Sequence, residues 1–153
     1  MPTYTESQIR TAIETVINAN TTNAVVFPWW VLGDNPDLWP AILKSAGDGD
    51  KVHGYVITRQ ETAGDRKNAQ CVTRNFSYAI WGFHWYDTGT RTSNTDLTFN
   101  GELDAICNAL VIAASRPAEL QLISEELDFR VDLDVFGGQL LHYATGRMVI
   151  TQL

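Results

Sequence analysis

Two aspartates in one alternating segment are the residues whose types and spacing best suit chemistry. Asp132 and Asp134 lie in LDFRVDLDVF, where apolar and charged residues alternate from Leu127 to Phe136. On a β-strand two such carboxylates share a face about 7 Å apart, which could suit a divalent cation. No third and fourth oxygen ligand stands beside them, and Arg130 shares their face. A strand surface that faces solvent or a partner explains them better than a metal site.

The histidines form no metal-binding motif. His53, His84 and His142 include no HExxH and no i, i+4 pair, so a zinc site would need three strands to bring them together. Because His84 lies between tryptophans in WGFHWY, packing among aromatic side chains is the simpler interpretation.

The sequence also lacks the usual signs of a nucleophile or a phosphate-binding loop. Cys71 and Cys107 have neither a basic neighbourhood nor a helix N-terminus to lower the thiol pKa. Buried free thiols are expected at both positions, and a disulfide between them is the alternative that the sequence leaves open. No GxSxG and no GxxxxGK occurs. We therefore predict no catalytic residue, no metal and no cofactor, and a protein that is not an enzyme.

The elements that must position these residues follow from hydrophobic spacing and from turn residues. Helices are predicted at residues 6–19, at about 38–45 and around 99–111, with Ser93 or Asp96 capping the last one. Strands are predicted at residues 23–33, with Pro28 marking an edge or bulge, and at 52–60, 70–86, 127–136 and 140–153. Strands in hairpins with helices between them predict one α+β domain over residues 1–153, a mostly antiparallel sheet with two main α-helices packed on it.

Two of these strands carry information about burial. Near its end, the strand at 70–86 is apolar on both faces, so it is either central, with helices on each side, or covered by another subunit. In the alternating segment, the apolar face from Leu127 to Val135 is expected to build the core. Its carboxylates then mark the outer face of the sheet.

Composition limits the kind of partner. The chain of 153 residues has 18 Asp and Glu against 11 Lys and Arg, a formal net charge of -7, which argues against binding nucleic acid through its phosphates. Its aromatic residues are numerous for one small core, so some are expected to face a partner. The candidates are Trp29, Trp30, Trp81 and Trp85. A small basic spot, Arg66 and Lys67, is either a solvated turn or a contact for an acidic surface.

The last third of the chain resembles a known protein family. The segments FNGELDAICNAL, from Phe99 to Leu110, and FGGQLLHYATGRMVI, from Phe136 to Ile150, are similar to the tail terminator and tail-completion proteins of tailed bacteriophages. The earlier segments VHGYVITRQ and RNFSYAIWGF look like the central hairpin of the same proteins. These motifs consist mostly of packing residues rather than of a catalytic signature.

The resemblance implies a structural virion protein of the tail or neck, assembled in the host cytoplasm. Such proteins form a ring, expected to be hexameric, that caps the tail tube, ends its polymerisation and joins the tail to the head–tail connector or stopper. They need no cofactor and no membrane, and DNA passes through the ring without specific binding. An acidic surface at Asp128, Asp132 and Asp134 would repel DNA phosphates if it faced the channel.

Three alternatives remain open at the level of sequence. A neighbouring connector or stopper ring would have the same general features. A tail-like bacterial device of phage origin would use the same fold. A small-ligand-binding α+β domain could instead build an aromatic pocket from Trp81, Trp85 and His84.

Overall fold

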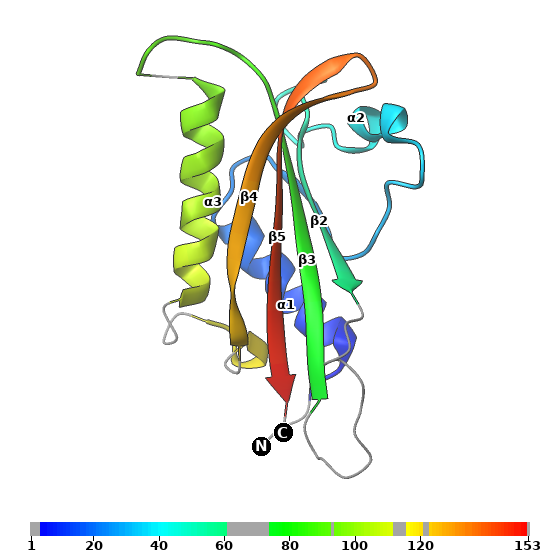
Figure 1. Ribbon diagram of the computed structural model, residues 1–153, viewed down its shortest axis with the longest axis vertical. Coiled ribbons are helices and arrows are strands. Elements are labelled where there is room, and N and C mark those ends of the chain that lie inside the picture. The colour runs from blue at the N-terminus through cyan, green and yellow to red at the C-terminus, as the bar shows by residue number, and fades with distance from the viewer. Residues whose placement is uncertain (1–3, 61–73, 93, 112–115, 121–122, 153) are drawn as a thin grey trace.

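The computed structural model describes residues 4–60, 74–92, 94–111, 116–120 and 123–152. The elements are, in chain order, α1 (Glu6–Ala19), β1 (Val25–Phe27), the 3-10 turn η1 (Pro36–Leu38), α2 (Trp39–Ile42), β2 (His53–Gln60), β3 (Arg74–Trp85), α3 (Thr95–Val111), the 3-10 turn η4 (Ala118–Leu120), β4 (Ile123–Phe136) and β5 (Gln139–Gln152) (Figure 1).

The strands form one five-stranded sheet in the order β1-β2-β3-β5-β4. β1 pairs with β2 in parallel, and the other neighbouring pairs are antiparallel. This is the predicted α+β fold, a mostly antiparallel sheet with helices packed on it. β3 and β5 occupy the middle of the sheet, and β1 and β4 form its two edges.

The first helix begins and ends where side chains satisfy free backbone groups. Thr5 Oγ1 accepts a hydrogen bond from the Gln8 amide at 3.2 Å, and Gln8 Oε1 accepts one from the Thr5 amide at 2.8 Å. This reciprocal capping box fixes the N-terminus, and Asn20 caps the other end. The prediction of a helix over residues 6–19 is confirmed.

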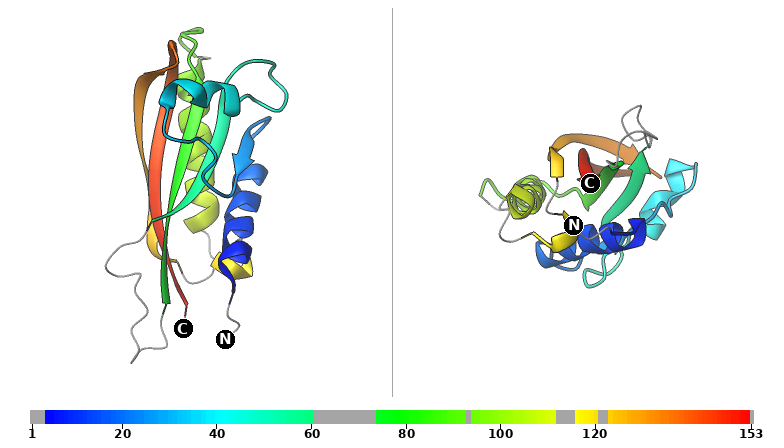
Figure 2. Two further views of the ribbon diagram at one scale, coloured as in Figure 1. Left: turned by 90° about the vertical axis from the view of Figure 1, so that its right-hand side faces the viewer. Right: turned by 90° about the horizontal axis from the view of Figure 1, so that it is seen from below.

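Both long helices cover the same face of the sheet, as the view from below shows (Figure 2). The core between helices and sheet includes side chains from α1, β2, β3, α3 and β5: Ile9, Ile13, Ile17, Tyr55, Ile57, Tyr78, Ile80, Phe99, Ile106, Met148 and Ile150. Burial of each such side chain contributes about 1.5–3 kcal/mol, so this face carries most of the hydrophobic stabilisation.

The opposite face is covered in part by the segment that contains η1 and α2. Trp39 stacks on Phe136 with ring centroids 5.6 Å apart and meets Phe83 edge-on at 5.9 Å. Leu43 and Val56 complete this second cluster of buried side chains. Of the two explanations for the doubly apolar strand, the first holds in part: β3 is central, and its own chain covers both of its faces.

Several element boundaries differ from the prediction. The strand expected at residues 23–33 is reduced to β1, which ends directly before Pro28 because proline has no N–H to offer a neighbouring strand. The expected edge position of this strand is confirmed. α3 begins at Thr95, and the side chain of Asn94 accepts a hydrogen bond from the Leu97 amide at 3.0 Å. Of the two predicted caps, Asp96 lies within the helix, and Ser93 lies outside the described residues.

The expectation that the whole apolar face of the alternating segment is buried is wrong. Leu127 is buried and Phe129 packs against the core, but Val131, Leu133 and Val135 are 41%, 46% and 59% exposed. Length explains the difference. The 14 residues of β4 span about 48 Å, whereas the 17 residues of α3 span about 26 Å. A helix of that length cannot cover the whole strand.

Candidate functional site

The exposed part of the β4–β5 hairpin forms an apolar surface that we call the hairpin strip: Val131, Leu133, Val135 and Leu140. The three β4 residues alternate along the strand, and Leu140 pairs with Val135 across the turn, so all four share the face on which the helices lie. Leu140 is 40% exposed. Scattered single apolar residues on a surface need no explanation, but contiguous ones mark a place of contact.

The free edge of β4 beside this strip is closed by aspartates. Asp132 Oδ1 accepts a hydrogen bond from the Leu133 amide at 2.8 Å, and Asp134 Oδ1 accepts one from the Val135 amide at 2.8 Å. An edge strand exposes backbone donors to which another strand can add. Because the neighbouring carboxylate already occupies two of these donors, strand addition is disfavoured along this part of the edge.

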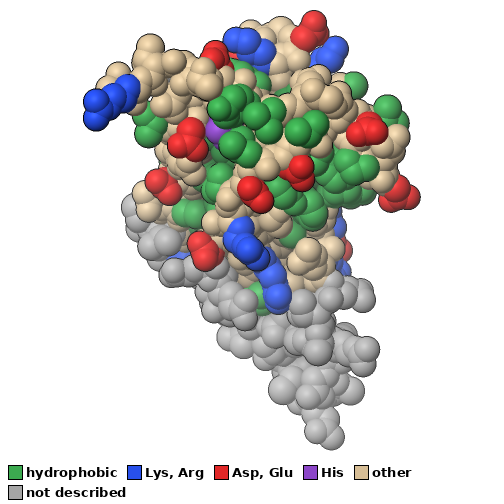
Figure 3. All heavy atoms as spheres, turned by 45° about the horizontal axis from the view of Figure 1, so that its top comes forward, with side chains coloured by type: hydrophobic (Ala, Val, Ile, Leu, Met, Phe, Trp, Pro, Cys, Tyr) green, Lys and Arg blue, Asp and Glu red, His purple; other side chains and the backbone are tan. Residues whose placement is uncertain are grey.

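The surface predicted to be acidic, at Asp128, Asp132 and Asp134, also carries positive charge because arginines lie among its aspartates. A hollow of about 550 Å³ on the other face of the hairpin is lined by two aspartates, two arginines and the polar side chains of β5: Asp128, Arg130, Asp132, Tyr143, Thr145 and Arg147. Figure 3 shows acidic side chains scattered among hydrophobic ones, with basic side chains both above and below them. Within the described ranges no three His, Cys, Asp or Glu side chains are arranged to hold a metal ion.

The four candidate tryptophans lie in different places. Trp29 and Trp30, which we call the tryptophan patch, follow Pro28 in the loop after β1 and are 59% and 40% exposed. Trp29 lines a hollow beside α1 together with Arg10. Trp30 also contacts Trp81, with ring centroids 5.4 Å apart, on the face of the sheet that α2 covers. Trp85 lies elsewhere, stacked on His84 at 3.9 Å. The basic spot at Arg66 and Lys67 lies outside the described residues.

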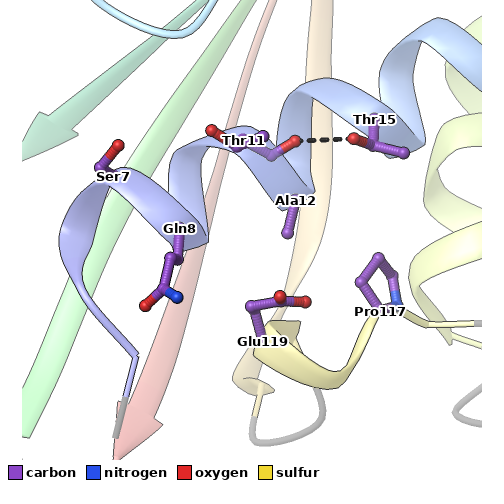
Figure 4. A pocket seen from close by; sticks show the side chains of 7 residues that line it. All are labelled: Ser7, Gln8, Thr11, Ala12, Thr15, Pro117 and Glu119. Atoms are coloured by element: carbon purple, nitrogen blue, oxygen red, sulfur yellow. Dashed lines mark hydrogen bonds between the residues drawn. The ribbon is translucent and has the colours of Figure 1, made fainter.

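A shallow groove runs between α1 and the segment that contains η4. It has a volume of about 380 Å³ and is lined by Ser7, Gln8, Thr11, Ala12, Thr15, Pro117 and Glu119 (Figure 4). The Thr15 hydroxyl donates to the Thr11 carbonyl at 2.9 Å. Glu119 is the one ionisable side chain in this lining, so the groove offers no pair of groups for acid–base catalysis.

Cys107 is not placed to act as a nucleophile. Burial, together with Asp104 and Asp128, raises the pKa of its thiol to about 11. Its Sγ lies 3.6 Å from the Leu127 carbonyl oxygen, which accepts the weak S–H bond. A thiol with a raised pKa is protonated at neutral pH and unreactive. Cys71 lies outside the described residues.

The sequence did not reveal that the three histidines lie in one row. His53 pairs with His84 across β2 and β3, and His84 pairs with His142 across β3 and β5. All three are at most 3% exposed. The three strands do bring these residues together, although packing among aromatic rings, as predicted, also describes their surroundings. Only the strand register could have shown this, and the register is not readable from spacing within one strand.

The chain matches no protein-family model, and no curated protein matches it. Among the described residues, no helix combines the length and apolar character required to cross a membrane.

Proposed function

We propose that the protein is a structural subunit of a bacteriophage tail, a tail terminator whose copies form a hexameric ring on the tail tube. The ring ends tube polymerisation and joins the tail to the head–tail connector. The resemblance of Phe99–Leu110 and Phe136–Ile150 to that family supports the proposal. The described surface is compatible with this proposal, because its exposed apolar side chains can contact another protein and no group of catalytic side chains is found among them.

One observation carries the proposal: the described chain exposes two different apolar surfaces. The hairpin strip lies on β4, at one edge of the sheet. The tryptophan patch lies in the loop after β1, where Trp29 stands beside α1 and Trp30 contacts Trp81. A ring of identical subunits needs a heterologous contact, in which one surface of each copy meets a different surface of the next. Tryptophans are frequent anchors of such contacts. The tryptophan patch on the hairpin strip is the pairing that we propose.

The capped edge of β4 indicates how the two surfaces meet. Asp132 and Asp134 occupy the donors of Leu133 and Val135, so a neighbour gains little by adding a strand there. The contact is then made by side chains, with Val131, Leu133 and Val135 against aromatic rings of the next copy. Aromatic and aliphatic side chains stacked in this way lose water-exposed area on both partners.

The proposal places the protein in the neck of the virion. Its partners are further copies of itself, the tail tube protein and the connector or stopper protein. DNA passes through the ring without specific binding, which a net charge of -7 favours because the phosphates are repelled. A connector or stopper ring would use the same two surfaces, and its failure to cap tubes would distinguish it.

No observation favours the alternative of a ligand pocket built from Trp81, Trp85 and His84. Trp81 contacts Trp30 and Tyr143, whereas Trp85 stacks on His84 and contacts His53. The two tryptophans thus belong to separate clusters of rings within the described residues.

The first test is the size and shape of the purified protein, alone and with purified tail tubes. Light scattering with negative-stain imaging should show a ring with a central hole of roughly 20 Å or more, the width of a DNA duplex, either in solution or at tube ends. Tubes mixed with the protein should stop growing. Tubes that keep growing with no ring at their ends would contradict the proposal.

The second test separates the two surfaces. Leu133→Asp puts a charge into the hairpin strip, and Trp29→Asp puts one into the tryptophan patch. Neither variant should assemble alone. A mixture of the two retains one intact contact and should form heterodimers but no ring. Asn108→Asp adds the same charge at an exposed position in the C-terminal half of α3, outside both surfaces, and should assemble normally. Rings from either single variant, or no heterodimer from the mixture, would show that these surfaces do not pair.

A further inference from the structure

The histidine row lies beneath the N-terminal half of α3. From this helix Glu102 Oε1 accepts hydrogen bonds from His53 Nε2 at 2.7 Å and from Tyr55 Oη at 2.5 Å. Thr95 Oγ1 lies 2.8 Å from His142 Nε2. The ring of Phe99 packs against His84 and His142 with centroids 5.7 and 5.9 Å away. Polar contacts to histidines therefore hold this half of the helix on the sheet.

The partners of each histidine determine which ring nitrogen carries its proton. A carboxylate and a backbone carbonyl can only accept, so His53 donates from Nε2 to Glu102 and His84 donates from Nδ1 to the Trp85 carbonyl at 2.8 Å. Thr95 donates its hydroxyl proton to the Asp87 carbonyl at 2.8 Å, so His142 Nε2 donates to Thr95 Oγ1. Each neutral ring thus has one N–H in use and one nitrogen with a lone pair.

Two of these lone-pair nitrogens are buried without a hydrogen-bond partner. They are His53 Nδ1 and His84 Nε2, on rings whose centroids lie 4.7 Å apart. A second proton on His84 would find no carboxylate or carbonyl acceptor at Nε2 among the described residues. The positive charge of a doubly protonated His84 would also lie between His53 and His142. The ring centroids of His84 and His142 are 6.3 Å apart. The closed arrangement therefore favours a neutral His84.

We propose that the histidine row is an acid-sensitive latch, in which protonation of His84 releases the N-terminal half of α3 from the sheet. The released state would hydrate the row and let each imidazolium find water as its acceptor. It would also uncover more apolar surface beside the hairpin strip, because Leu133 pairs with His142 in the sheet. This device does not depend on the tail-terminator proposal.

Some of the charged and titratable groups around the row lower the pKa values of His84 and His142, and others raise them. The pKa of His84 is lowered to about 4, chiefly by burial and also by His53 and His142, while the hydrogen bond to the Trp85 carbonyl and the charge of Glu102 oppose the shift. Burial lowers the pKa of His142, against Asp96 on α3. Tyr55 has its pKa raised well above 10 by burial and by Glu102, so it stays neutral. Lys51 lies 5.1 Å from the centre of the Trp85 ring, on the outer side of the row.

The sign of the effect follows from proton linkage. With a pKa near 4 when closed and an ordinary value near 6.5 when hydrated, His84 binds more protons in the released state between these two values. Acid in that window therefore favours release, and the closed state is fully favoured only above about pH 6.5. The ratio of released to closed molecules should rise at least about tenfold between pH 7 and pH 5.

Amide hydrogen exchange on the full chain tests the latch, with α1 as an internal reference. After correction for intrinsic rates, protection in the first two turns of α3 should fall at least about tenfold between pH 7 and pH 5, while α1 is unchanged. His84→Asn places an amide N–H where Nδ1 donates but cannot titrate in this range, so its α3 protection should change less than about threefold. Equal loss in α1 and α3, no loss down to about pH 4.5, or an unchanged response in His84→Asn would overturn the proposal.

A second measurement covers the case in which His84→Asn fails to fold. The ring Cε1–H resonance of His84 in the unaltered protein should titrate together with the loss of α3 protection. A His84 that titrates near its ordinary pKa while α3 stays closed would contradict the latch. Added Zn²⁺ provides a further arm: slower α3 exchange with Zn²⁺ at neutral pH would reassign the two free nitrogens to metal binding and also overturn the proposal.

Discussion

At the scale of single residues, the carboxylates of the alternating segment have a structural role that charge alone does not describe. Asp132 and Asp134 each accept a hydrogen bond from the amide of the next residue. Aspartate is suited to such local backbone bonds because its side chain is short. These bonds satisfy donors that would otherwise point outward from an edge strand. The effect belongs to solubility and to choice of partner rather than to catalysis.

A pair of double variants separates this hydrogen bonding from charge. Asp132→Ala with Asp134→Ala removes the acceptors and should raise the rate of aggregation several-fold, because the edge donors become free. Asp132→Asn with Asp134→Asn removes the same charge but keeps an acceptor oxygen, and should aggregate more slowly than the alanine pair. Light scattering over time provides the measurement. Equal aggregation of the two double variants would show that charge, not capping, protects the edge.

At the scale of elements, the sequence predicted where the strands lie and which side chains share a face. It did not predict which faces other elements of the chain cover. Alternation in β4 correctly grouped Leu127, Val131 and Leu133 on one face, because successive side chains point to opposite sides of any strand. Whether that face is covered depends on the length and position of α3, which the local pattern does not contain. The histidine row was missed for a related reason, since it arises from the register of three strands. Of the four candidate tryptophans, Trp29 and Trp30 are exposed, and their contact with a partner stays a prediction.

The contact between η1 and the β4–β5 turn provides a test at this scale. Gly137 and Gly138 both have positive φ, of 56° and 79°, but a side chain on Gly137 would collide with the Asp37 backbone oxygen, whereas Gly138 faces open space. Gly138→Ala should lower the free energy of unfolding by about 1 kcal/mol through backbone strain alone. Gly137→Ala should lower it by at least about 2 kcal/mol because η1 must also move.

Denaturant unfolding of the two variants measures this difference, with Gly138→Ala as the matched control. Equal losses would mean that η1 does not rest on the hairpin turn in solution. The hydrogen bond from the Gly137 amide to Asp37 Oδ1 at 3.3 Å joins residues 100 apart in sequence, so a weakened contact should also loosen the Trp39–Phe136 stack.

At the scale of the whole molecule, net charge and its placement decide how DNA would pass an assembled ring. The hollow beside Asp128 and Asp132 also contains Arg130 and Arg147, so the positive charges of its lining balance the negative ones. If it lines the channel, the repulsion that keeps DNA mobile comes from the acidic side chains around it and from the net charge of -7. Long-range repulsion of this kind depends on the sum of charges near the pore rather than on one residue.

Reversal of these charges tests the placement. Changing Asp128, Asp132 and Asp134 to lysine moves the net charge from -7 to -1 and should slow DNA ejection from assembled particles, because phosphates would bind the channel. Changing Asp34, Asp50 and Asp104 to lysine gives the same net charge elsewhere on the surface and should leave ejection unchanged. Ejection at the normal rate in the first variant would place the three aspartates away from the channel.

The position of β5 has a consequence for synthesis. β5 is the last of the five strands along the chain, yet it lies between β3 and β4 and pairs with both. Until the ribosome has released residues 139–152, β4 has no partner in the sheet and β3 has one open edge. A nascent chain that has reached the α3 segment therefore displays a long, aromatic strand whose pairing is incomplete. Chaperone binding to newly made chains should be strongest in that interval and should end when β5 enters the sheet.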